Sequence, residues 1–494
     1  MYFTSTRSPR NVTSAQAIAR GLAEDGGLFI PSEFPKISGE LIDRMIDMDY
    51  KARAREVLAL YLTDFSADEI ARSVEAAYTG TFDSENPAPI VEVAPGLNVL
   101  ELWHGPTCAF KDMALQLLPH LLTISARKAA PGRTMVILTA TSGDTGKAAL
   151  DGFADVPGTK IIVFYPQNGV SAMQKLQMVT QKGDNVAVCA IEGNFDDAQN
   201  GVKKIFADRE MKEYLNAHNM EFSSANSINF GRLAPQIVYY VSAYCDLIRQ
   251  GKLRKGEAFN VAVPTGNFGN ILAAVYAREM GIPIARLICA SNRNNILTDF
   301  IRTGVYDRNR PFYTTTSPSM DILISSNLER MLSLLYGGDT SAVAGLMEEL
   351  ARNGRYSISD AAREKLQSEF FGGFCDDAGT AATIGEIYRK YHYLCDPHTA
   401  VALNVYEQYR RETGDATPCV LASTASPFKF AAAVLPAIQP GELPADEFGM
   451  VAKLSEVTGV PVPKPLAGLK DLPVLHKGCV SKEGMKLFIR NFLQ

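Results

Sequence analysis

Short apolar runs rich in β-branched residues recur along this 494-residue chain, and each leads into a segment with helical spacing of its apolar residues. Most of the runs are continuous rather than alternating, which is typical of strands covered on both faces. Strands that alternate with helices predict right-handed β-α-β units and parallel sheets. A helical stretch at 235–249 divides the runs into two clusters. The runs lie at 135–140, 160–165, 186–191, 259–264, 286–290 and 419–423.

The two clusters predict an α/β protein with two parallel-sheet domains and a cleft between them. A small, mainly helical domain should precede both, because apolar residues before position 85 follow helical spacing and Ser66 is placed to cap a helix. The chain is also too long for one typical domain. We therefore expect an N-terminal domain at 1–85, a first α/β domain at 86–234 and a second, larger α/β domain at 235–494.

Composition narrows the class of protein. Hydrophobic residues make up 46% and charged residues 21%, and the formal net charge is -5. These values give no reason to expect nucleic acid or an anionic membrane as a partner. The eight cysteines are scattered without zinc-ligand spacing, so we expect buried thiols, no metal and a cytoplasmic location. No apolar stretch is long enough to cross a bilayer. The sequence leaves open whether the chain is a monomer or a homodimer.

Lys111 is the first candidate for chemistry. It follows the turn-forming stretch 103–110 and stands at the start of a predicted helix, which Pro119 should bend or interrupt. The positive end of a helix dipole disfavours an ammonium ion there and favours a neutral amine. A neutral amine is the form that makes a Schiff base with an aldehyde. The alternative is an ordinary surface lysine near a helix start, which is the commoner case for a lysine chosen at random.

A glycine-rich turn follows the first strand of the first cluster. Ser142, Gly143, Asp144 and Thr145 lie where this strand gives way to a helical pattern. Backbone N–H groups exposed at such a junction can hold a carboxylate or a phosphate. A tight turn with a helix cap would look the same in sequence.

A second glycine-rich turn follows the strand at 259–264. It comprises Gly266, Asn267, Phe268, Gly269 and Asn270. Its glycines permit close approach of the backbone, and the following helix start supplies partial positive charge, so the turn is a candidate phosphate cradle. It matches neither a Walker loop nor GxGxxG, which favours a phosphate ester smaller than a nucleotide.

A third segment has side chains suited to an anion. Asn226, Ser227 and Asn229 precede Arg232, whose guanidinium can grip a phosphate with two hydrogen bonds. The alternative places Arg232 on a solvated helix face.

His398 follows an aspartate and a proline. Asp396 as helix cap and Pro397 in the first helical position account for this motif, so His398 needs no catalytic role.

Taken together, the lysine and both turns give the chain a resemblance to the threonine synthases, pyridoxal-phosphate enzymes of fold type II. The resemblance covers nearly the whole length and rests on the order and number of the motifs. They are DGGLFIP at 25–31, HGPT at 104–107, FKD at 110–112, SGDTG at 142–146, NSIN at 226–229, GNFGN at 266–270 and STA at 423–425.

The resemblance implies pyridoxal 5'-phosphate as cofactor, joined to Lys111 as a Schiff base. Residues 266–270 would hold the cofactor phosphate, and the hydroxyl of Thr424 would face the pyridine nitrogen. The implied fold is that of fold type II enzymes, with the cofactor between the two α/β domains.

The resemblance also implies a substrate, O-phospho-L-homoserine. Ser142 to Thr145 would meet its carboxylate, and Arg232 with residues 226–229 would hold its phosphate. The implied reaction removes this phosphate from Cγ and adds water at Cβ to give L-threonine, with Lys111 as the base.

One departure from the family pattern concerns position 426, where relatives often have histidine before proline and this chain has Ser426. We infer no role for it. Rival functions within the fold are a phosphohomoserine phospho-lyase and a serine/threonine dehydratase, both of which yield a 2-oxo acid. The second anion site at Arg232 favours the phosphorylated substrate over serine. A cofactor-binding protein without catalysis is the alternative from another class.

Overall fold

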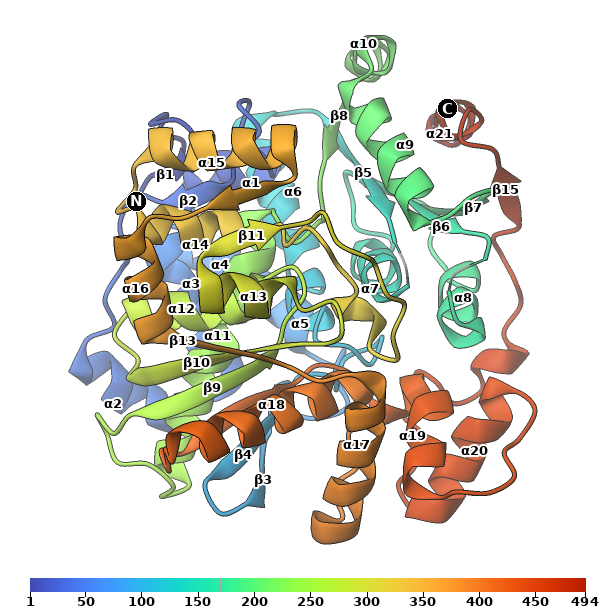
Figure 1. Cartoon of the computed structure of the whole chain (residues 1–494). Helices are drawn as coiled ribbons and strands as arrows, with labels where there is room; N and C mark the ends of the chain where they lie inside the picture. Colours follow the sequence, from blue (N-terminus) through green and yellow to red (C-terminus); the bar gives the residue numbers. More distant parts are fainter. Residues whose placement is uncertain (142, 169) are drawn as a thin grey trace.

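The computed structural model describes residues 1–141, 143–168 and 170–494. Two sheets organise the molecule (Figure 1), and all but one of their strand pairs are parallel; β3 pairs antiparallel at an edge. The six-stranded sheet has the order β13 (Phe370–Phe374), β10 (Ile284–Ser291), β9 (Phe259–Pro264), β14 (Cys419–Ser423), β4 (Leu97–Glu101) and β3 (Ile90–Ala94). The five-stranded sheet has the order β15 (Gly478–Val480), β7 (Val186–Ile191), β6 (Thr159–Pro166), β5 (Thr134–Ala140) and β8 (Met220–Ser223).

The two-sheet α/β fold confirms the fold class predicted from the apolar runs. All six predicted runs are strands, three in each sheet. Every residue of β7, β9 and β14 is buried, which explains why their sequences are continuously apolar rather than alternating.

Sheet membership does not follow the predicted division at residues 86 and 235. β3 and β4 precede the first strand cluster in the chain, yet they lie in the six-stranded sheet beside β14. β15 comes near the end of the chain and pairs with β7 of the five-stranded sheet. The chain therefore crosses between the two sheets after β4, and Lys111 lies on this crossing.

A mainly helical layer precedes the two sheets, together with one antiparallel strand pair. The predicted cap Ser66 is present. Its hydroxyl accepts a hydrogen bond from the N–H of Glu69, and the Glu69 side chain accepts one from the N–H of Ser66. The elements are β1 (Phe3–Ser5), α1 (Ser14–Arg20), β2 (Phe29–Pro31), α2 (Gly39–Asp47), α3 (Tyr50–Tyr61) and α4 (Ala67–Tyr78).

A central helix, α11 (Phe230–Arg249), joins these parts. It is buried along nearly its whole length and contacts α2 and α3 of the N-terminal layer. It also contacts α5 (Asp112–Leu115), which follows Lys111, and α12 (Gly269–Glu279), which follows the second glycine-rich turn. The helix that separates the two strand clusters in sequence is thus the shared core of the structure.

The remaining helices cover the sheets and their edges. α7 and α9 contact the five-stranded sheet, and α13 and α18 contact the six-stranded sheet. In the described part of the chain no helix is both long and apolar enough to span a bilayer. The bounds are α6 (Leu118–Ala129), α7 (Asp144–Phe153), α8 (Ala172–Val179), α9 (Phe195–Ala207), α10 (Arg209–Ala217), α13 (Ile296–Thr303), α14 (Leu328–Leu335), α15 (Thr340–Asn353), α16 (Asp360–Glu369), α17 (Asp377–Tyr391), α18 (Pro397–Thr413), α19 (Ala431–Ile438), α20 (Glu447–Thr458) and α21 (Met485–Leu493). Short elements are β11 (Val305–Asp307), β12 (Arg355–Ser357), η1 (Pro318–Met320), η2 (Pro427–Phe430) and η3 (Leu469–Asp471).

A buried ion pair fastens the N-terminal layer to the central helix. Arg53 on α3 lies 2.6 Å from Asp246 on α11, and both side chains are at most 2% exposed. The same guanidinium donates to the carbonyl oxygens of Met45 and Ile46. The N–H groups of the Arg53 guanidinium are thus hydrogen-bonded to acceptors on both α2 and α11.

Replacing Arg53 with methionine should destabilise the protein by up to about 3–5 kcal/mol, because it leaves the buried carboxylate of Asp246 with the partly exposed Arg249 as its cationic partner. Urea unfolding measures the loss. Arg55→Met is the matched control, since the pair of Arg55 with Glu75 is exposed and contributes about 0.2–1 kcal/mol. Equal effects of the two substitutions would contradict this assignment.

Candidate active site

Lys111 caps α5, directly after the segment that crosses from β4, as the helix-start prediction required. Pro119 marks the start of a separate helix, α6, and so interrupts the pattern. Backbone hydrogen bonds hold the crossing segment beside the chain that follows β14: the N–H of Phe110 donates to the oxygen of Thr424 at 2.8 Å, and that of Ser426 to the oxygen of Cys108 at 3.0 Å. Lys111 is therefore placed by contacts with residues more than three hundred positions away.

The amine of Lys111 is buried among polar groups. Its Nζ lies 3.5 Å from Asp144 Oδ2 and donates to Ser319 Oγ at 3.4 Å. Burial lowers the pKa of Lys111; attraction to Asp144 opposes this, and the charges of Lys429 and Arg232 add to it. The shift is toward the neutral amine, and its main cause is desolvation rather than the dipole of the four-residue α5.

Asp144 occupies the first position of α7, in the first glycine-rich turn. Its Oδ1 accepts hydrogen bonds from Lys429 Nζ at 2.7 Å and from Gln174 Nε2 at 3.1 Å. Although burial opposes ionisation, the positive charge of Lys429, together with that of Lys111 when it is protonated, holds the pKa of Asp144 well below its usual range. Asp144 is therefore a permanent buried anion.

Some backbone N–H groups of this turn are already hydrogen-bonded within the protein. Gly143 has a φ of 142°, and a side chain there would collide with Gln174. The hydroxyl of Thr141 accepts from the N–H groups of Gly143 and Gly146. An anion would therefore be held by the other N–H groups at the start of α7, near the half-buried Thr145. Ser142, the remaining predicted residue, lies outside the described residues.

The second glycine-rich turn is built as the start of α12. Phe268 adopts a left-handed conformation and precedes Gly269, the first helical residue. Ser325 Oγ donates to the carbonyl oxygen of Gly266 at 2.7 Å, and Asn327 donates twice to that of Asn267. With its carbonyl groups engaged from one side, the turn has the N–H groups of a helix start to offer an anion.

Two features of this turn indicate close packing and a spare donor. A Cβ atom at Gly266 would lie 2.6 Å from the backbone oxygen of Ser319. Asn270 Oδ1 accepts from Tyr240 at 2.5 Å, whereas its buried Nδ2 has no hydrogen-bond partner among the described residues. An unpaired buried donor beside a helix start favours an anionic ligand.

Arg232 lies in the first turn of α11 and is buried, which excludes the solvated-face interpretation. Its Nη1 donates to the oxygen of Ala225 at 3.0 Å, and its Nε has no hydrogen-bond partner in the part of the chain that the structure describes. Among residues 1–141, 143–168 and 170–494 no carboxylate comes within 4 Å of it. Burial lowers its pKa to about 10, so the group remains a cation near neutral pH. A buried guanidinium without a counter-ion is suited to an anionic ligand.

The residues before Arg232 divide into two kinds. Asn229 caps α11 by accepting from the N–H of Gly231, and its amide donates to the oxygens of Ile18 and Ser224. Its side chain is thus used to hold the segment. Asn226 and Ser227 are only half-buried.

Thr424 is buried directly after β14, beside the segment that carries Lys111. His398 follows the predicted cap: Asp396 caps α18 with Pro397 in its first turn. In addition, His398 Nε2 accepts from the N–H of Ser319 at 3.2 Å, and its Nδ1 contacts Asp396 at 2.5 Å. His398 thus fixes the segment that touches Lys111.

Two residues at the site gave no usable signal in the sequence. Ser319 belongs to the short helix η1 in an irregular segment. Lys429 lies in η2, and the fact that it is a charged residue between Phe428 and Phe430 was its only signal. Both reach the site through contacts with distant parts of the chain.

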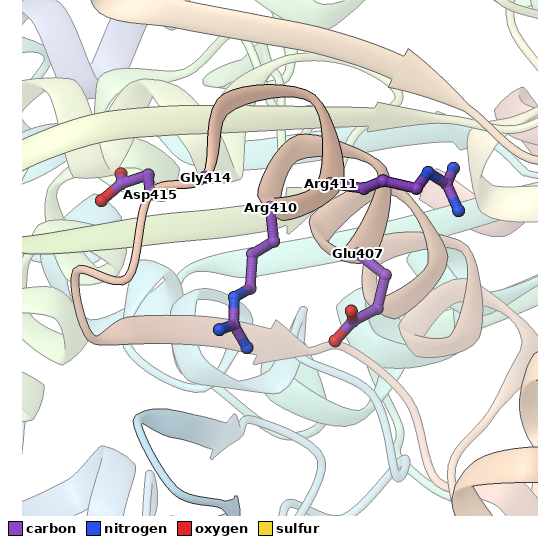
Figure 2. Close-up of a pocket in the computed structure, with 5 residues that line it drawn as sticks. All are labelled: Glu407, Arg410, Arg411, Gly414 and Asp415. Carbon is purple, nitrogen blue, oxygen red and sulfur yellow. The ribbon is translucent and has the colours of Figure 1, made fainter.

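A hollow at the end of α18 lies apart from this cluster. Glu407, Arg410, Arg411, Gly414 and Asp415 line it (Figure 2). The side chains point in different directions around the helix end, and Asp415 points away from the others. None of them contacts the Lys111 cluster, so we do not assign the hollow to the active site.

Comparisons with known families define the class. Residues 82–424 match the family described as "Pyridoxal-phosphate dependent enzyme". Residues 2–78 match "Threonine synthase N terminus", and residues 399–472 match "Threonine synthase, C-terminal". The fold and these matches define a member of the pyridoxal-phosphate-dependent enzymes of fold type II.

Comparison with individual proteins identifies the family within this class of enzymes. Threonine synthase-like 1 of Homo sapiens is 42% identical over 87% of this chain and 58% of its own length, so this chain spans about three fifths of that relative. Threonine synthase of Pseudomonas aeruginosa is 39% identical over 88% of this chain and 90% of its own. The crystal structure of PLP-bound threonine synthase from Brucella melitensis aligns with a TM-score of 0.88 at 37% identity, covering 100% of this chain and 99% of that one. The chain belongs to the threonine synthase family.

The cofactor of this family, pyridoxal 5'-phosphate, fits the residues present. Lys111 offers a buried amine to its aldehyde. The start of α12 and the unpaired Nδ2 of Asn270 offer donors to its phosphate. Arg232 is left as a second cation for another anion.

Gly266→Ala should weaken cofactor binding by about tenfold, because forcing a Cβ against the fixed Ser319 oxygen costs about 1–3 kcal/mol. Titration of the cofactor-free protein, followed by absorbance, measures the affinity. Gly269→Ala is the informative companion: its Cβ would meet Asn327 Nδ2 at 3.5 Å and Gln236 Nε2 at 3.9 Å, which are ordinary contacts that the protein itself tolerates. A loss of affinity without loss of thermal stability in that variant would mean that the phosphate lies against Gly269. Wild-type cofactor affinity in both variants would show that the cofactor phosphate binds elsewhere.

Proposed function

We propose that this enzyme converts O-phospho-L-homoserine and water to L-threonine and phosphate. The observation that carries the proposal is the buried guanidinium of Arg232, which has no counter-ion among the described residues and is close enough for its charge to lower the pKa of Lys111. The cofactor phosphate has its own candidate site at the start of α12. A second cation beside Lys111 therefore suits a phosphorylated substrate, whereas serine or threonine would leave it unpaired.

The proposed binding mode separates the two ends of the substrate. Arg232, with Asn226 and Ser227, holds the phosphate. The turn of Ser142 to Thr145 holds the carboxylate through backbone N–H groups. The carboxylate of Asp144 does not repel it strongly, because Lys429 and Gln174 occupy one of its oxygens and the other faces Lys111.

When bound, pyridoxal phosphate withdraws electron density from the substrate and so supplies acidity at Cα and then at Cβ. Lys111, as a neutral amine, accepts the proton from Cα; once it has passed this proton back to the conjugated substrate it is neutral again and can accept one from Cβ. Arg232 stabilises the phosphate as the bond between Cγ and oxygen breaks. Water then adds its oxygen to Cβ, and protons return to the carbon chain from Lys111.

Enclosure of the site limits side reactions. Lys111 and Asp144 are both buried, and the segment around Ser319 lies against Lys111 and Gly266. His398 and Asp396 hold this segment in place. Exclusion of bulk water protects reactive species from hydrolysis to a 2-oxo acid.

A second candidate is an elimination-only enzyme of the same family, which would release 2-oxobutyrate from the same substrate. It stays open because this chain is 42% identical to threonine synthase-like 1 of Homo sapiens, whose name does not state its reaction, and 39% identical to the Pseudomonas aeruginosa threonine synthase. The two candidates share every binding role above. They differ only in whether water reaches Cβ before the product leaves.

Lys111→Ala should abolish turnover and covalent attachment of the cofactor while leaving the fold intact, because one amine serves as anchor and base. Loss of the absorbance of the attached cofactor, with an unchanged circular dichroism spectrum, is the expected result. Near-normal threonine production by the folded variant would rule out the role of Lys111.

Arg232→Ala should keep wild-type cofactor affinity but lower kcat/KM for O-phospho-L-homoserine by about tenfold to more than a hundredfold, since a charge-assisted contact contributes about 1.5–3 kcal/mol. Arg232→Lys should recover only part of the loss, because an ammonium cannot reproduce a two-pronged contact.

The matched control is Arg249→Ala at the far end of the same helix, where the side chain is 46% exposed and pairs with Asp246. It should leave kcat/KM unchanged. Lost cofactor affinity in Arg232→Ala, or no kinetic effect at all, would place Arg232 outside the substrate site.

A further inference from the structure

Lys429 is a buried charge to which the reaction described above gives no role. Its side chain is fully buried, and its Nζ donates to Asp144 Oδ1 at 2.7 Å and to the oxygen of Thr107 at 2.9 Å. Asp144 turns its other oxygen toward Lys111 at 3.5 Å. That oxygen has no hydrogen-bond partner among the described residues. One carboxylate thus lies between two lysines.

The charges of these three residues decide which form of Lys111 is stable. Asp144 and Lys429 together are neutral, so the buried trio is neutral only when Lys111 is an uncharged amine. An ammonium at Lys111 would leave a net positive charge in a buried site, which is unfavourable. Without Lys429 the charged form of Lys111 becomes the more stable one, because only an ammonium at Lys111 would then compensate the negative charge of Asp144.

Of the other ionisable groups near Lys111, Arg232 acts in the same direction, Cys108 is neutral, and Asp112 is a buried carboxylate whose pKa burial raises to about 6. Arg232 adds a further positive charge. Asp112, the neighbouring carboxylate, is turned to the hydroxyl and N–H of Thr107 at 2.6 and 2.8 Å. Burial raises the pKa of the Cys108 thiol to about 12, so it is uncharged. Asp144 is therefore the anion that opposes a neutral Lys111.

We propose that Lys429 is a positioning residue that neutralises Asp144 and thereby keeps Lys111 as a free amine, able to attach the cofactor and to act as a base. The inference rests on the proposed role of Lys111. It gives a role to a lysine that is buried between Phe428 and Phe430.

The test compares Lys429→Met with the wild type in the rate at which cofactor-free protein takes up pyridoxal phosphate, followed by absorbance from pH 6 to 10. Only the neutral amine reacts, so the rate rises with pH through the pKa of Lys111. Removing Lys429 raises this pKa, and the rising limb should move about one to two units to higher pH. At neutral pH uptake should slow about tenfold to a hundredfold.

Two further variants keep the test decisive. Asp144→Asn combined with Lys429→Met removes both charges, so it should fold even where the single variant is unstable, and its limb should return toward the wild-type position. Lys147→Met is the matched control: it removes a positive charge from α7 that pairs with Asp151 and should leave the limb in place.

The proposal would be overturned if the rising limb of the rate–pH profile stayed at the wild-type pH in folded Lys429→Met. It would also be overturned if the double variant showed the same shift as Lys429→Met. An equal shift in Lys147→Met would overturn it too. The assay uses no phosphohomoserine, so its result is independent of whether the enzyme turns over that substrate. Wild-type uptake by Lys111→Ala would instead contradict the assignment of Lys111 itself.

Discussion

The buried carboxylate of Asp144 is the interaction on which the site depends. It sits at the start of α7, which covers the five-stranded sheet, and it binds Lys429 and faces Lys111. Both lysines follow strands of the six-stranded sheet, β14 and β4. One anion therefore joins the two halves of the molecule where the chemistry is proposed. Its neighbours also determine whether the amine of Lys111 is charged.

Burial of unpaired polar groups is a cost that a folded protein keeps only where something offsets it. The described part of the active-site region holds three such groups: Arg232 Nε, Asn270 Nδ2 and Asp144 Oδ2. Two are donors without acceptors, each beside a helix start, and two anions are proposed to bind here, the phosphate of the cofactor and that of the substrate. The third faces the amine that must lose its proton. These three atoms lie at the proposed binding and proton-transfer sites, whereas other unpaired buried atoms, such as the hydroxyls of Tyr50 and Tyr214, lie in other parts of the described chain.

Local patterns in the sequence were sufficient for much of this structure. The strands of both sheet centres could be predicted because two buried faces require continuous apolar runs, and Ser66 and Asp396 could be predicted as caps because capping depends on neighbours in the chain. β3, β4 and β15 could not be assigned to their sheets, since their partners are distant in sequence. Lys429 and Ser319 were missed for the same reason. The contact of Asn229 with substrate stays a prediction, and the sequence did not indicate that its side chain caps a helix and holds its own segment.

The most direct test of the proposed function is the fate of oxygen from water labelled with the heavy isotope 18O. The purified enzyme is given O-phospho-L-homoserine in the labelled water, and its products are analysed by mass spectrometry. Breaking the bond between Cγ and oxygen, followed by addition of water at Cβ, predicts threonine with one labelled hydroxyl and unlabelled phosphate. Labelled phosphate with homoserine would indicate simple phosphate-ester hydrolysis. Release of 2-oxobutyrate in place of threonine would show that the reaction stops at elimination, and either result would contradict threonine synthesis by this chain.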